Sequence, residues 1–195
     1  MNWEIGELLM DELKIIESCL RGNTEVFSRL IDSYKNMVYN LAYRMNNNPQ
    51  EAEDISQEAF LRAFQSLVRF NSSYKFSTWL YQITLNIIRD RFKKKELNCV
   101  SLDTPLEKDD SEFYPQPADL THNPEQIIAQ QENTQTIQQA ILSLPLKYRE
   151  VIVLRHLQDL SYVEISNILK IPAGTIKIRL YRAREQLKKI LKTSR

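Results

Sequence analysis

The stretch SYVEISNILKIPAGTIKIRLYRAREQLKKIL, residues 161–191, decides the fold of the C-terminal end of this chain. Ser161 and Glu164 have the spacing of a capping box, in which each side chain accepts a hydrogen bond from a free amide at the start of a helix. Helical periodicity continues to Leu169, and Lys170-Ile171-Pro172 then interrupts it before a second helical run begins. Two helices joined by so short a turn predict a helix-turn-helix motif.

The second helix of this motif has two chemically different sides. The side expected to be buried carries apolar residues at helical spacing, namely Ile176, Leu180, Ala183 and Leu187. The opposite side carries groups that can contact phosphates and base edges in a DNA major groove, namely Thr175, Lys177, Ile178, Arg179, Tyr181, Arg182 and Arg184. A helical hairpin with a solvated cationic face is the alternative interpretation.

Charge is distributed unevenly along the 195 residues, although the formal net charge is only +1. Residues 96–144 hold nine acidic residues and one lysine, whereas residues 145–195 hold twelve Lys and Arg and four acidic residues. The basic end favours a polyanionic partner. Between 96 and 122 helical periodicity disappears while prolines and acids accumulate, which is typical of a flexible linker. We therefore predict domains at 1–95 and 123–195, joined by an acidic linker.

The N-terminal domain is predicted to contain four helices. Apolar residues recur every three or four positions over 11–20 and 24–45, which indicates two amphipathic helices. A third helix is predicted to begin with Asn48 as its cap, Pro49 at its first position and Glu51 reaching back as a capping-box acid. Ser77 is the predicted cap of the fourth helix, which ends in a basic cluster near residue 95.

The fold class follows from these patterns. Helices are also expected over 123–142 and 145–157, ahead of the helix-turn-helix. The chain has only three glycines, which disfavours a sheet built on tight hairpin turns. We predict an all-α protein made of two small helical domains and a flexible acidic linker.

Several classes of protein are disfavoured by what the sequence lacks. No window approaches the roughly 20 apolar residues of a membrane span, and the first residues lack the pattern of a secretory signal, so we expect no stable membrane insertion and a cytoplasmic location. Cys19 and Cys99 are far apart and are expected to be free thiols, and with only two histidines we predict no metal site. No phosphate-binding GxxxxGK[ST] loop and no pairing of a nucleophile with a base is present, so we expect neither a cofactor nor an enzymatic activity.

Three stretches of the chain resemble one protein family. Residues 161–191 resemble the domain with which extracytoplasmic-function (ECF) RNA polymerase sigma factors read the promoter -35 element, called sigma region 4. QEAEDISQEAFLRAFQSLVRF at 50–70 and KFSTWLYQITLNIIRDRFKKK at 75–95 resemble the polymerase-binding and -10 reading segments of sigma region 2. The pattern is most similar to the envelope-stress sigma factors of Gram-positive bacteria. A conventional helix-turn-helix transcriptional regulator, the alternative function, has no use for the two N-terminal segments.

The resemblance implies that the chain binds core RNA polymerase and directs promoter-specific transcription initiation, without nucleotide hydrolysis, in a stress response. It assigns contacts with the clamp coiled coil of the polymerase to Asp54, Gln57, Glu58 and Leu61. It assigns capture of the melted -10 strand to Asn71, Ser73, Lys75, Phe76, Trp79, Asn86 and Arg89. Trp79 also has the spacing of a core residue, which we rank above direct DNA contact.

In the -35 set, the resemblance favours base contacts by Lys177, Ile178, Tyr181 and Arg182, and phosphate contacts or packing by Thr175, Arg179 and Arg184. Two residues depart from the family pattern. Lys170 replaces a usual glycine or asparagine, which implies a left-handed residue or an altered turn, and Ile178 replaces a small or polar residue. The resemblance also implies an anti-sigma factor as a partner. The linker is expected either to lie in a basic polymerase channel or to act as a spacer.

Overall fold

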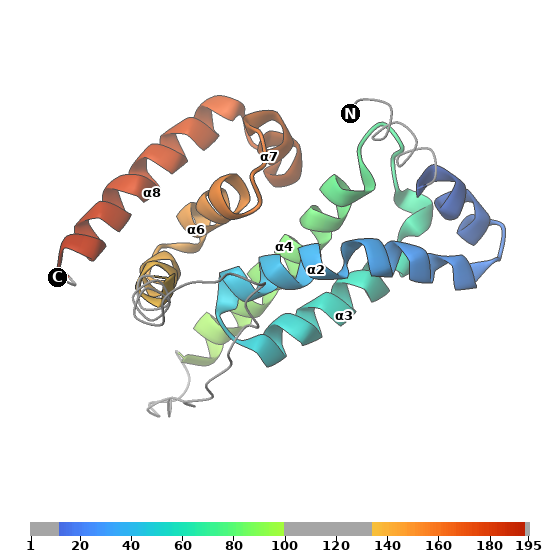
Figure 1. Ribbon diagram of the computed structural model, residues 1–195, viewed down its shortest axis with the longest axis horizontal. Helices are drawn as coiled ribbons and strands as arrows, with labels where there is room; N and C mark the ends of the chain where they lie inside the picture. Colours follow the sequence, from blue (N-terminus) through green and yellow to red (C-terminus); the bar gives the residue numbers. More distant parts are fainter. Residues whose placement is uncertain (1–11, 100–133, 194–195) are drawn as a thin grey trace, which may run out of the picture.

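The computed structural model describes residues 12–99 and 134–193, and these residues form helices, turns and loops without a strand (Figure 1). The N-terminal unit contains a helix at 12–20, the short helix η1 (Thr24–Val26), α2 (Phe27–Asn46), α3 (Pro49–Gln65), η2 (Leu67–Arg69) and α4 (Phe76–Cys99). The C-terminal unit contains a helix at 134–142, α6 (Leu146–Ile152), the π-helical turn η3 (Val153–Leu157), α7 (Tyr162–Leu169) and α8 (Ala173–Thr193). The predicted all-α class is confirmed. The greater part of the predicted linker lies outside the described residues.

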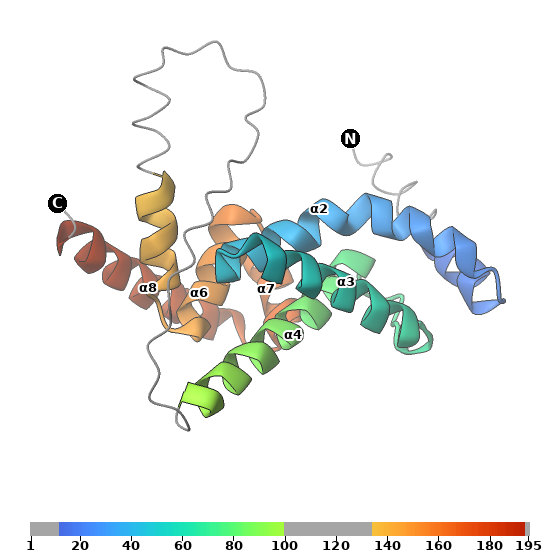
Figure 2. The same ribbon diagram turned by 90° about the horizontal axis from the view of Figure 1, so that it is seen from below.

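The core of the N-terminal unit lies where α2, α3 and α4 pack together (Figure 2). Small residues on α3, among them Ala52 and Ala59, are fully buried, which allows the neighbouring helices to approach closely. Large apolar residues fill the space between the three helices, including Leu41, Ile55 and Leu80, each fully buried. Burial of such a side chain contributes roughly 1.5 to 3 kcal/mol, so this packing is the main source of stability of the unit.

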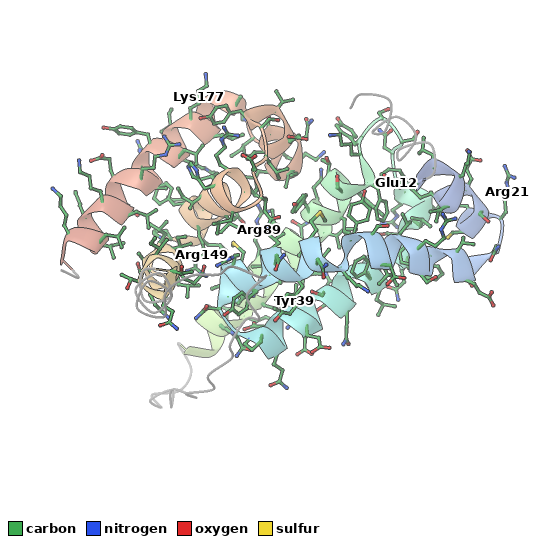
Figure 3. All side chains as sticks on the ribbon, viewed as in Figure 1. Glu12, Arg21, Tyr39, Arg89, Arg149 and Lys177 are labelled. Carbon is green, nitrogen blue, oxygen red and sulfur yellow. The ribbon has the colours of Figure 1, made fainter. Side chains whose placement is uncertain are left out.

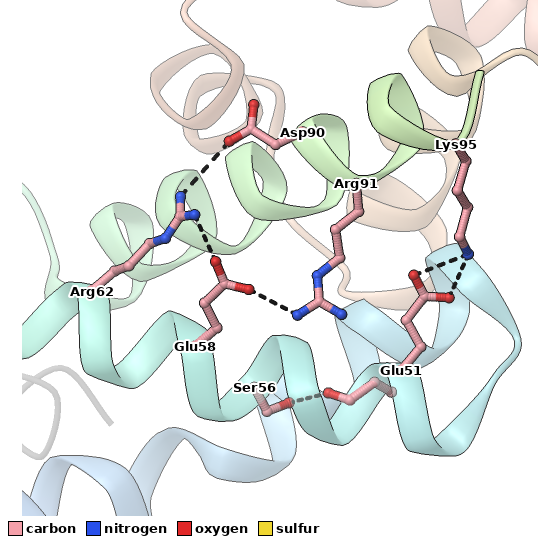
Figure 4. Close-up of polar contacts among 8 residues, drawn as sticks. Glu51, Ser56, Glu58, Arg62, Asp90, Arg91 and Lys95 are labelled. Carbon is pink, nitrogen blue, oxygen red and sulfur yellow. Dashed lines mark hydrogen bonds and ion pairs between the residues drawn. The ribbon is translucent and has the colours of Figure 1, made fainter. Parts of the chain in front are cut away.

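The start of α3 confirms one half of the predicted capping box. Asn48 has extended backbone geometry, and its side-chain oxygen accepts a hydrogen bond from the Glu51 amide at 2.9 Å. The prediction for the Glu51 carboxylate is wrong, because this carboxylate binds the Lys95 ammonium of α4 at 2.9 and 3.1 Å (Figure 4). A cation from a neighbouring helix is a stronger partner for a carboxylate than a neutral amide is.

The limits of α4 differ from the prediction at both ends. The helix begins at Phe76, one residue before the predicted cap Ser77, and the Lys75 carbonyl accepts hydrogen bonds from the amides of Thr78 and Trp79. Ser77 therefore lies inside the first turn. At its other end the helix continues to Cys99, so the first four residues of the predicted linker are helical.

The helix-turn-helix forms as the sequence predicts. Ser161 and Glu164 make both bonds of the capping box, at 3.3 Å from the Glu164 amide to the Ser161 hydroxyl and 3.0 Å from the Ser161 amide to the Glu164 carboxylate. Lys170 adopts the left-handed conformation with φ of 57°, which confirms one of the two predicted alternatives for the turn. Ile176 and Leu180 are buried on the inner face of α8.

We expect Ser161→Ala to lower the free energy of unfolding by about 0.5 to 2 kcal/mol, because the first turn of α7 loses its side-chain acceptor. Chemical denaturation followed by circular dichroism measures this change. Ser33→Ala removes an exposed hydroxyl within α2 and is expected to change stability by less than about 0.5 kcal/mol. Equal effects of the two substitutions would contradict the importance of the capping box.

The two units pack against each other, with α7 beside α4 and η3 beside α2. The C-terminal unit also caps α2, whose last carbonyls have no partner within the helix. Gln138 donates its side-chain amide to the Arg44 carbonyl at 3.0 Å, and the Arg149 guanidinium donates to the Met45 carbonyl at 2.8 Å. Figure 3 shows Arg149 at the junction of the two units. Burial lowers the pKa of this guanidinium from its ordinary value.

No helix in ranges 12–99 and 134–193 combines the length and the apolar character needed to span a lipid bilayer. The same ranges contain no group of three or more His, Cys, Asp or Glu side chains placed to hold a metal ion. Cys19 is a buried free thiol, and burial raises its pKa above the ordinary value.

Candidate nucleic-acid and partner interfaces

An open apolar groove of about 620 Å³ runs between α2 and α3 on the surface of the N-terminal unit. Its apolar lining consists of Phe27, Ile31, Phe60, Leu61 and Phe64, and Phe27 and Phe64 meet edge to face at 5.1 Å. The Leu61 side chain is 57% exposed. Exposed apolar surface gathered in a groove with a polar rim is typical of a site that binds another protein.

The structure divides the predicted polymerase-binding residues between two sides of α3. Gln57 and Leu61 line the apolar groove, and Asp54 is exposed on the same helix. Glu58 instead faces α4. Its carboxylate binds the guanidinium group of Arg91 on α4 at 2.8 Å and that of Arg62, one turn further along α3, at 2.6 Å (Figure 4). Glu58 therefore does not line the groove that Gln57 and Leu61 line.

The ion pair between Glu58 and Arg91 connects α3 to α4, and the neighbouring cations lower the pKa of Glu58. The hydrogen bond from Arg91 is the largest cause of a Glu58 pKa below the ordinary value, and the positive charge of Arg62 acts in the same direction. A carboxyl group with a lowered pKa in the folded state stabilises the fold above its unfolded pKa, and this contribution is lost as the pH falls through the folded pKa.

We expect Glu58→Gln to lower the free energy of unfolding by about 1 kcal/mol at neutral pH, a moderate value because the pair is partly solvated. The difference from the wild type is expected to shrink once the pH falls below the lowered pKa of Glu58, where the wild-type carboxyl is also neutral. Urea unfolding of both proteins at neutral pH and at several acidic pH values measures it. A difference that does not change with pH would show that the Glu58 charge is unimportant.

The predicted -10 residues occupy a loop and one face of α4. Asn71, Ser73 and Lys75 are exposed in the loop before α4, and the Asn71 side chain accepts a hydrogen bond from the Ser73 amide at 2.9 Å. This bond fixes the turn within the loop. Asn86 lies exposed on the third turn of α4, and Arg89 follows it at helical spacing. Asn71, Ser73, Lys75 and Asn86 are thus exposed, whereas Arg89 is partly buried.

Phe76 does not offer the aromatic surface expected of it. Its ring is 1% exposed and packs against Tyr34, Phe70 and Trp79, with centroid distances of 5.5 to 5.7 Å. Phe76 is buried because the rings of Tyr34, Phe70 and Trp79 surround it. Trp79 is half-buried, and its ring lies 5.3 Å from the Phe70 ring, so a ring contact joins residues on either side of the loop.

Two cations of the -10 set bind acidic residues of the C-terminal unit. The Arg89 guanidinium donates from Nε to the Glu150 carboxylate at 2.6 Å and from Nη1 to the Asn86 side chain at 3.1 Å. The Lys75 ammonium lies 3.3 Å from the Glu164 carboxylate. Figure 3 shows Arg89 directed to the junction between the units. The two partners are 61 positions apart in the Arg89–Glu150 pair and 89 positions apart in the Lys75–Glu164 pair. Sequence patterns, which act over a few residues, could not predict these pairs.

The -35 set lies along α8, mostly on its solvent side. Ile178 and Tyr181 are 55% and 67% exposed, and Lys177 points away from α6 in Figure 3. Arg182 is also exposed. The other three members are less free to contact DNA. Thr175 and Arg179 are half-buried, and Arg184 contacts a nitrogen of the His156 ring at 3.1 Å. The exposed members form a continuous polar and apolar face able to enter a major groove.

The C-terminal unit carries a helix-turn-helix with an exposed basic helix, and the N-terminal unit carries an exposed apolar groove. This combination is typical of a DNA-binding factor that acts together with a partner protein. Family models match both units. The model of Sigma-70 region 2 matches residues 30–97, and the model of Sigma-70 region 4 matches residues 134–187.

Curated relatives match along nearly the whole chain. The ECF RNA polymerase sigma factor SigW of Bacillus subtilis (strain 168) is 43% identical over 92% of this chain and 96% of its own length. The ECF RNA polymerase sigma-E factor of Escherichia coli (strain K12) is 32% identical over 94% of this chain and 95% of its own length. The chain belongs to the ECF RNA polymerase sigma factors, and the alternative of a conventional helix-turn-helix regulator is wrong.

Two solved structures share the fold. CnrH, solved in complex with the cytosolic domain of CnrY, matches with a TM-score of 0.66 and 20% identity over 93% of this chain and 97% of that one. The sigma factor RpoE of Bartonella quintana, solved with the anti-sigma factor NepR, matches with a TM-score of 0.68 and 22% identity over 87% of this chain and 98% of that one. Both likenesses show that the chain has the two-unit helical fold of these structures.

Proposed function

We propose that the two units perform separate tasks at a promoter. The N-terminal domain, residues 1–95, binds core RNA polymerase and captures the -10 strand, and the C-terminal domain, residues 123–195, reads the -35 duplex. The acidic segment 96–122 connects them. The observation that supports this division most strongly is the location of the apolar groove on one unit and the helix-turn-helix on the other. The chain acts in the cytoplasm and performs no catalysis.

The apolar groove between α2 and α3 is the proposed docking site for the polymerase clamp. Leu61 and Gln57 contact the partner directly, because both line the groove and both are exposed. Asp54 contributes a charged contact at the edge of the interface. Glu58 acts indirectly, because its ion pair with Arg91 connects α3 to α4. Such an arrangement of an apolar centre and a polar rim is typical of protein interfaces.

The loop 71–75 and the adjoining face of α4 are the proposed binding surface for the melted -10 strand. Asn71 and Ser73 offer hydrogen bonds to an extruded base, while Lys75 and Arg89 offer positive charge to the backbone. Asn86 lies between these groups on α4. We assign Phe76 a supporting role because it is buried, and Trp79 contributes only its exposed edge.

The exposed face of α8 is the proposed reader of the -35 duplex. Lys177, Tyr181 and Arg182 provide donors to base edges and phosphates, and the apolar Ile178 side chain suits the methyl group of thymine. Thr175, Arg179 and Arg184 are assigned to phosphates or to packing, which agrees with their partial burial or their contact with His156.

An anti-sigma factor is the proposed regulatory partner. RpoE of Bartonella quintana was solved with the anti-sigma factor NepR, and its fold matches this chain over 87% of the chain length. We propose that an anti-sigma factor likewise binds this chain, and that dissociation of the anti-sigma factor frees the chain to activate a stress response.

Reconstituted transcription tests the proposed function. Purified core RNA polymerase is incubated with a pool of genomic promoter fragments, with and without the chain, and the transcript start sites are sequenced. We expect start sites that depend on the chain and share one pair of upstream sequence elements. A pool that yields the same transcripts in both reactions would overturn the proposal.

A further inference from the structure

The apolar groove between α2 and α3 has two chemically different ends. The two helices are joined by a short turn after Asn46, so they run in opposite directions. At the end far from this turn, Phe27 of α2 meets Phe64 of α3 edge to face. At the end near the turn, the lining contains Tyr39 of α2, labelled in Figure 3, and Glu53 of α3. A partner that lies along the groove therefore meets hydrocarbon at one end and polar groups at the other.

A stacked pair of tyrosine rings lies at the polar end. Tyr39 and Tyr43 are one helical turn apart on α2, with an angle of 3° between the ring planes and 6.1 Å between the centroids. Burial is the largest cause of a Tyr39 pKa above the ordinary value, and Tyr43 and Glu53 add smaller effects in the same direction. The Tyr39 hydroxyl therefore stays protonated at neutral pH. A neutral tyrosine ring presents a partly negative face, which attracts a cation.

Glu53 adds a carboxylate that has no cationic partner. Its side chain is exposed and makes no ion pair with any residue in ranges 12–99 and 134–193. Glu51 and Glu58, also on α3, both bind cations of α4. Lys35, the cation of the groove lining, binds Asp32 at 2.9 Å. Among the described residues, the groove lining therefore carries one unpaired charge, which is negative and lies at the polar end.

An arginine side chain satisfies both groups at this end. The guanidinium group is planar, so it can stack on the Tyr39 ring while its N–H groups donate to the Glu53 carboxylate. A lysine ammonium would neutralise the carboxylate, but it is a compact, strongly hydrated charge without a plane to lay on the ring. An acidic side chain would be repelled by Glu53. The chemistry of the polar end therefore favours arginine.

We propose that Tyr39, Tyr43 and Glu53 form a receptor for one arginine of the polymerase helix that docks in the groove. We name these three residues the arginine receptor. This inference rests on the proposed docking of polymerase at the groove. The receptor fixes the direction of the docked helix, because its apolar side chains contact Phe27 and Phe64 while its arginine lies near the turn between α2 and α3. Complementary charge of this kind sets the register of an interface and excludes wrong partners.

The distance between the two ends constrains the partner. Phe27 and Tyr39 are twelve residues apart on α2, which corresponds to about 18 Å at roughly 1.5 Å per residue. A partner helix that lies along α2 spans this distance with about the same number of residues. We therefore expect the arginine of the polymerase helix to lie about three turns away from the apolar side chains that contact Phe27 and Phe64.

The test measures binding of the fluorescently labelled full-length chain to core RNA polymerase at low and high ionic strength. Glu53→Gln keeps the shape of the side chain and removes its charge. We expect this variant to bind about tenfold more weakly at low ionic strength, and the difference to shrink at high ionic strength, where salt screens the pair. Glu25→Gln is the matched control, because Glu25 is an exposed acid of the same unit outside the groove lining. We expect its affinity to stay within about twofold of the wild type.

Substitutions of Tyr39 separate the role of the ring from that of the hydroxyl. Tyr39→Phe keeps the ring and is expected to bind polymerase within about twofold of the wild type, whereas Tyr39→Leu is expected to bind about five- to tenfold more weakly. Tyr39→Leu combined with Glu53→Gln is expected to lose less than the product of the two separate fold-changes, because both residues bind the same guanidinium group. Losses that multiply in full would show that the two residues act on different groups and would contradict the receptor.

Photocrosslinking identifies the group that occupies the arginine receptor. Benzoylphenylalanine is incorporated in place of Tyr43 in the full-length chain, the complex with core polymerase is irradiated, and the crosslinked polymerase peptide is sequenced by mass spectrometry. We expect a peptide from a helix that carries an arginine within one turn of the crosslinked residue. A crosslinked peptide without an arginine at that distance overturns the inference.

The same binding assay keeps the receptor and the proposed function apart. Glu53→Gln indistinguishable from Glu25→Gln in polymerase affinity overturns the arginine receptor. If Leu61→Asp still weakens binding in that case, the groove remains the docking site without the receptor. If neither Glu53→Gln nor Leu61→Asp changes the affinity, docking in the groove is rejected together with the receptor.

Discussion

Leu61→Asp is expected to weaken binding to core RNA polymerase by roughly 30- to 1,000-fold, which corresponds to about 2 to 4 kcal/mol for a central residue of an interface. Leu61 is exposed in the free chain and lines the apolar groove between α2 and α3. A carboxylate placed there would lose its water on docking without gaining a partner. Titration of fluorescently labelled chain with core polymerase measures the affinity.

Leu20→Asp is the matched control for this substitution. Leu20 is 50% exposed, comparable with Leu61, and lies on the helix at 12–20 outside the groove lining. We expect its affinity for polymerase to stay within about twofold of the wild type, since exposed sites away from special features change energies by roughly 0.5 kcal/mol or less. If the two aspartate variants bind polymerase equally well, the groove is not the docking site.

Arg182→Ala is expected to reduce affinity for the cognate -35 duplex by about 10- to 100-fold, because a side chain that reads a base edge contributes roughly 1 to 3 kcal/mol of discrimination. Arg182 is exposed on α8 one residue after the strongly exposed Tyr181. On a scrambled duplex of equal length the loss is expected to be much smaller. Competition binding of the polymerase complex to the two duplexes gives both numbers.

Lys192→Ala provides the contrasting control, because Lys192 lies in the last turn of α8, beyond the base-reading set. It is expected to weaken binding to both duplexes equally and to reduce the salt dependence of binding by about one unit of slope. The assignment of Arg182 to base reading fails if its alanine variant also loses affinity equally on cognate and scrambled duplexes.

Local features of the fold were predictable because they depend on neighbouring residues. The Asn48 cap, the Ser161–Glu164 capping box and the left-handed Lys170 each follow from steric and hydrogen-bonding rules that act within four residues. The buried face of α8 followed from helical periodicity in the same way. The cap of α3, the start of α7 and the buried face of α8 were therefore accessible without coordinates.

The features that sequence patterns did not predict depend on side-chain contacts between different helices. Glu51 binds Lys95 and Glu58 binds Arg91, so two carboxylates on α3 are directed to α4 instead of to a cap or an interface. Phe27 joins Leu61 in one groove although the two lie on different helices. The exposed aromatic and aliphatic residues on α3 are the signal that could have located this groove.

Site-specific photocrosslinking in the assembled complex tests the central claim most directly. A photoreactive amino acid is placed at Leu61, Ser73 or Tyr181, and each full-length variant is irradiated with core polymerase and an open promoter. We predict that position 61 crosslinks to polymerase, position 73 to the single strand around -10, and position 181 to the duplex around -35. A crosslink from position 61 to DNA, or from position 73 and position 181 to the same promoter element, would contradict the account.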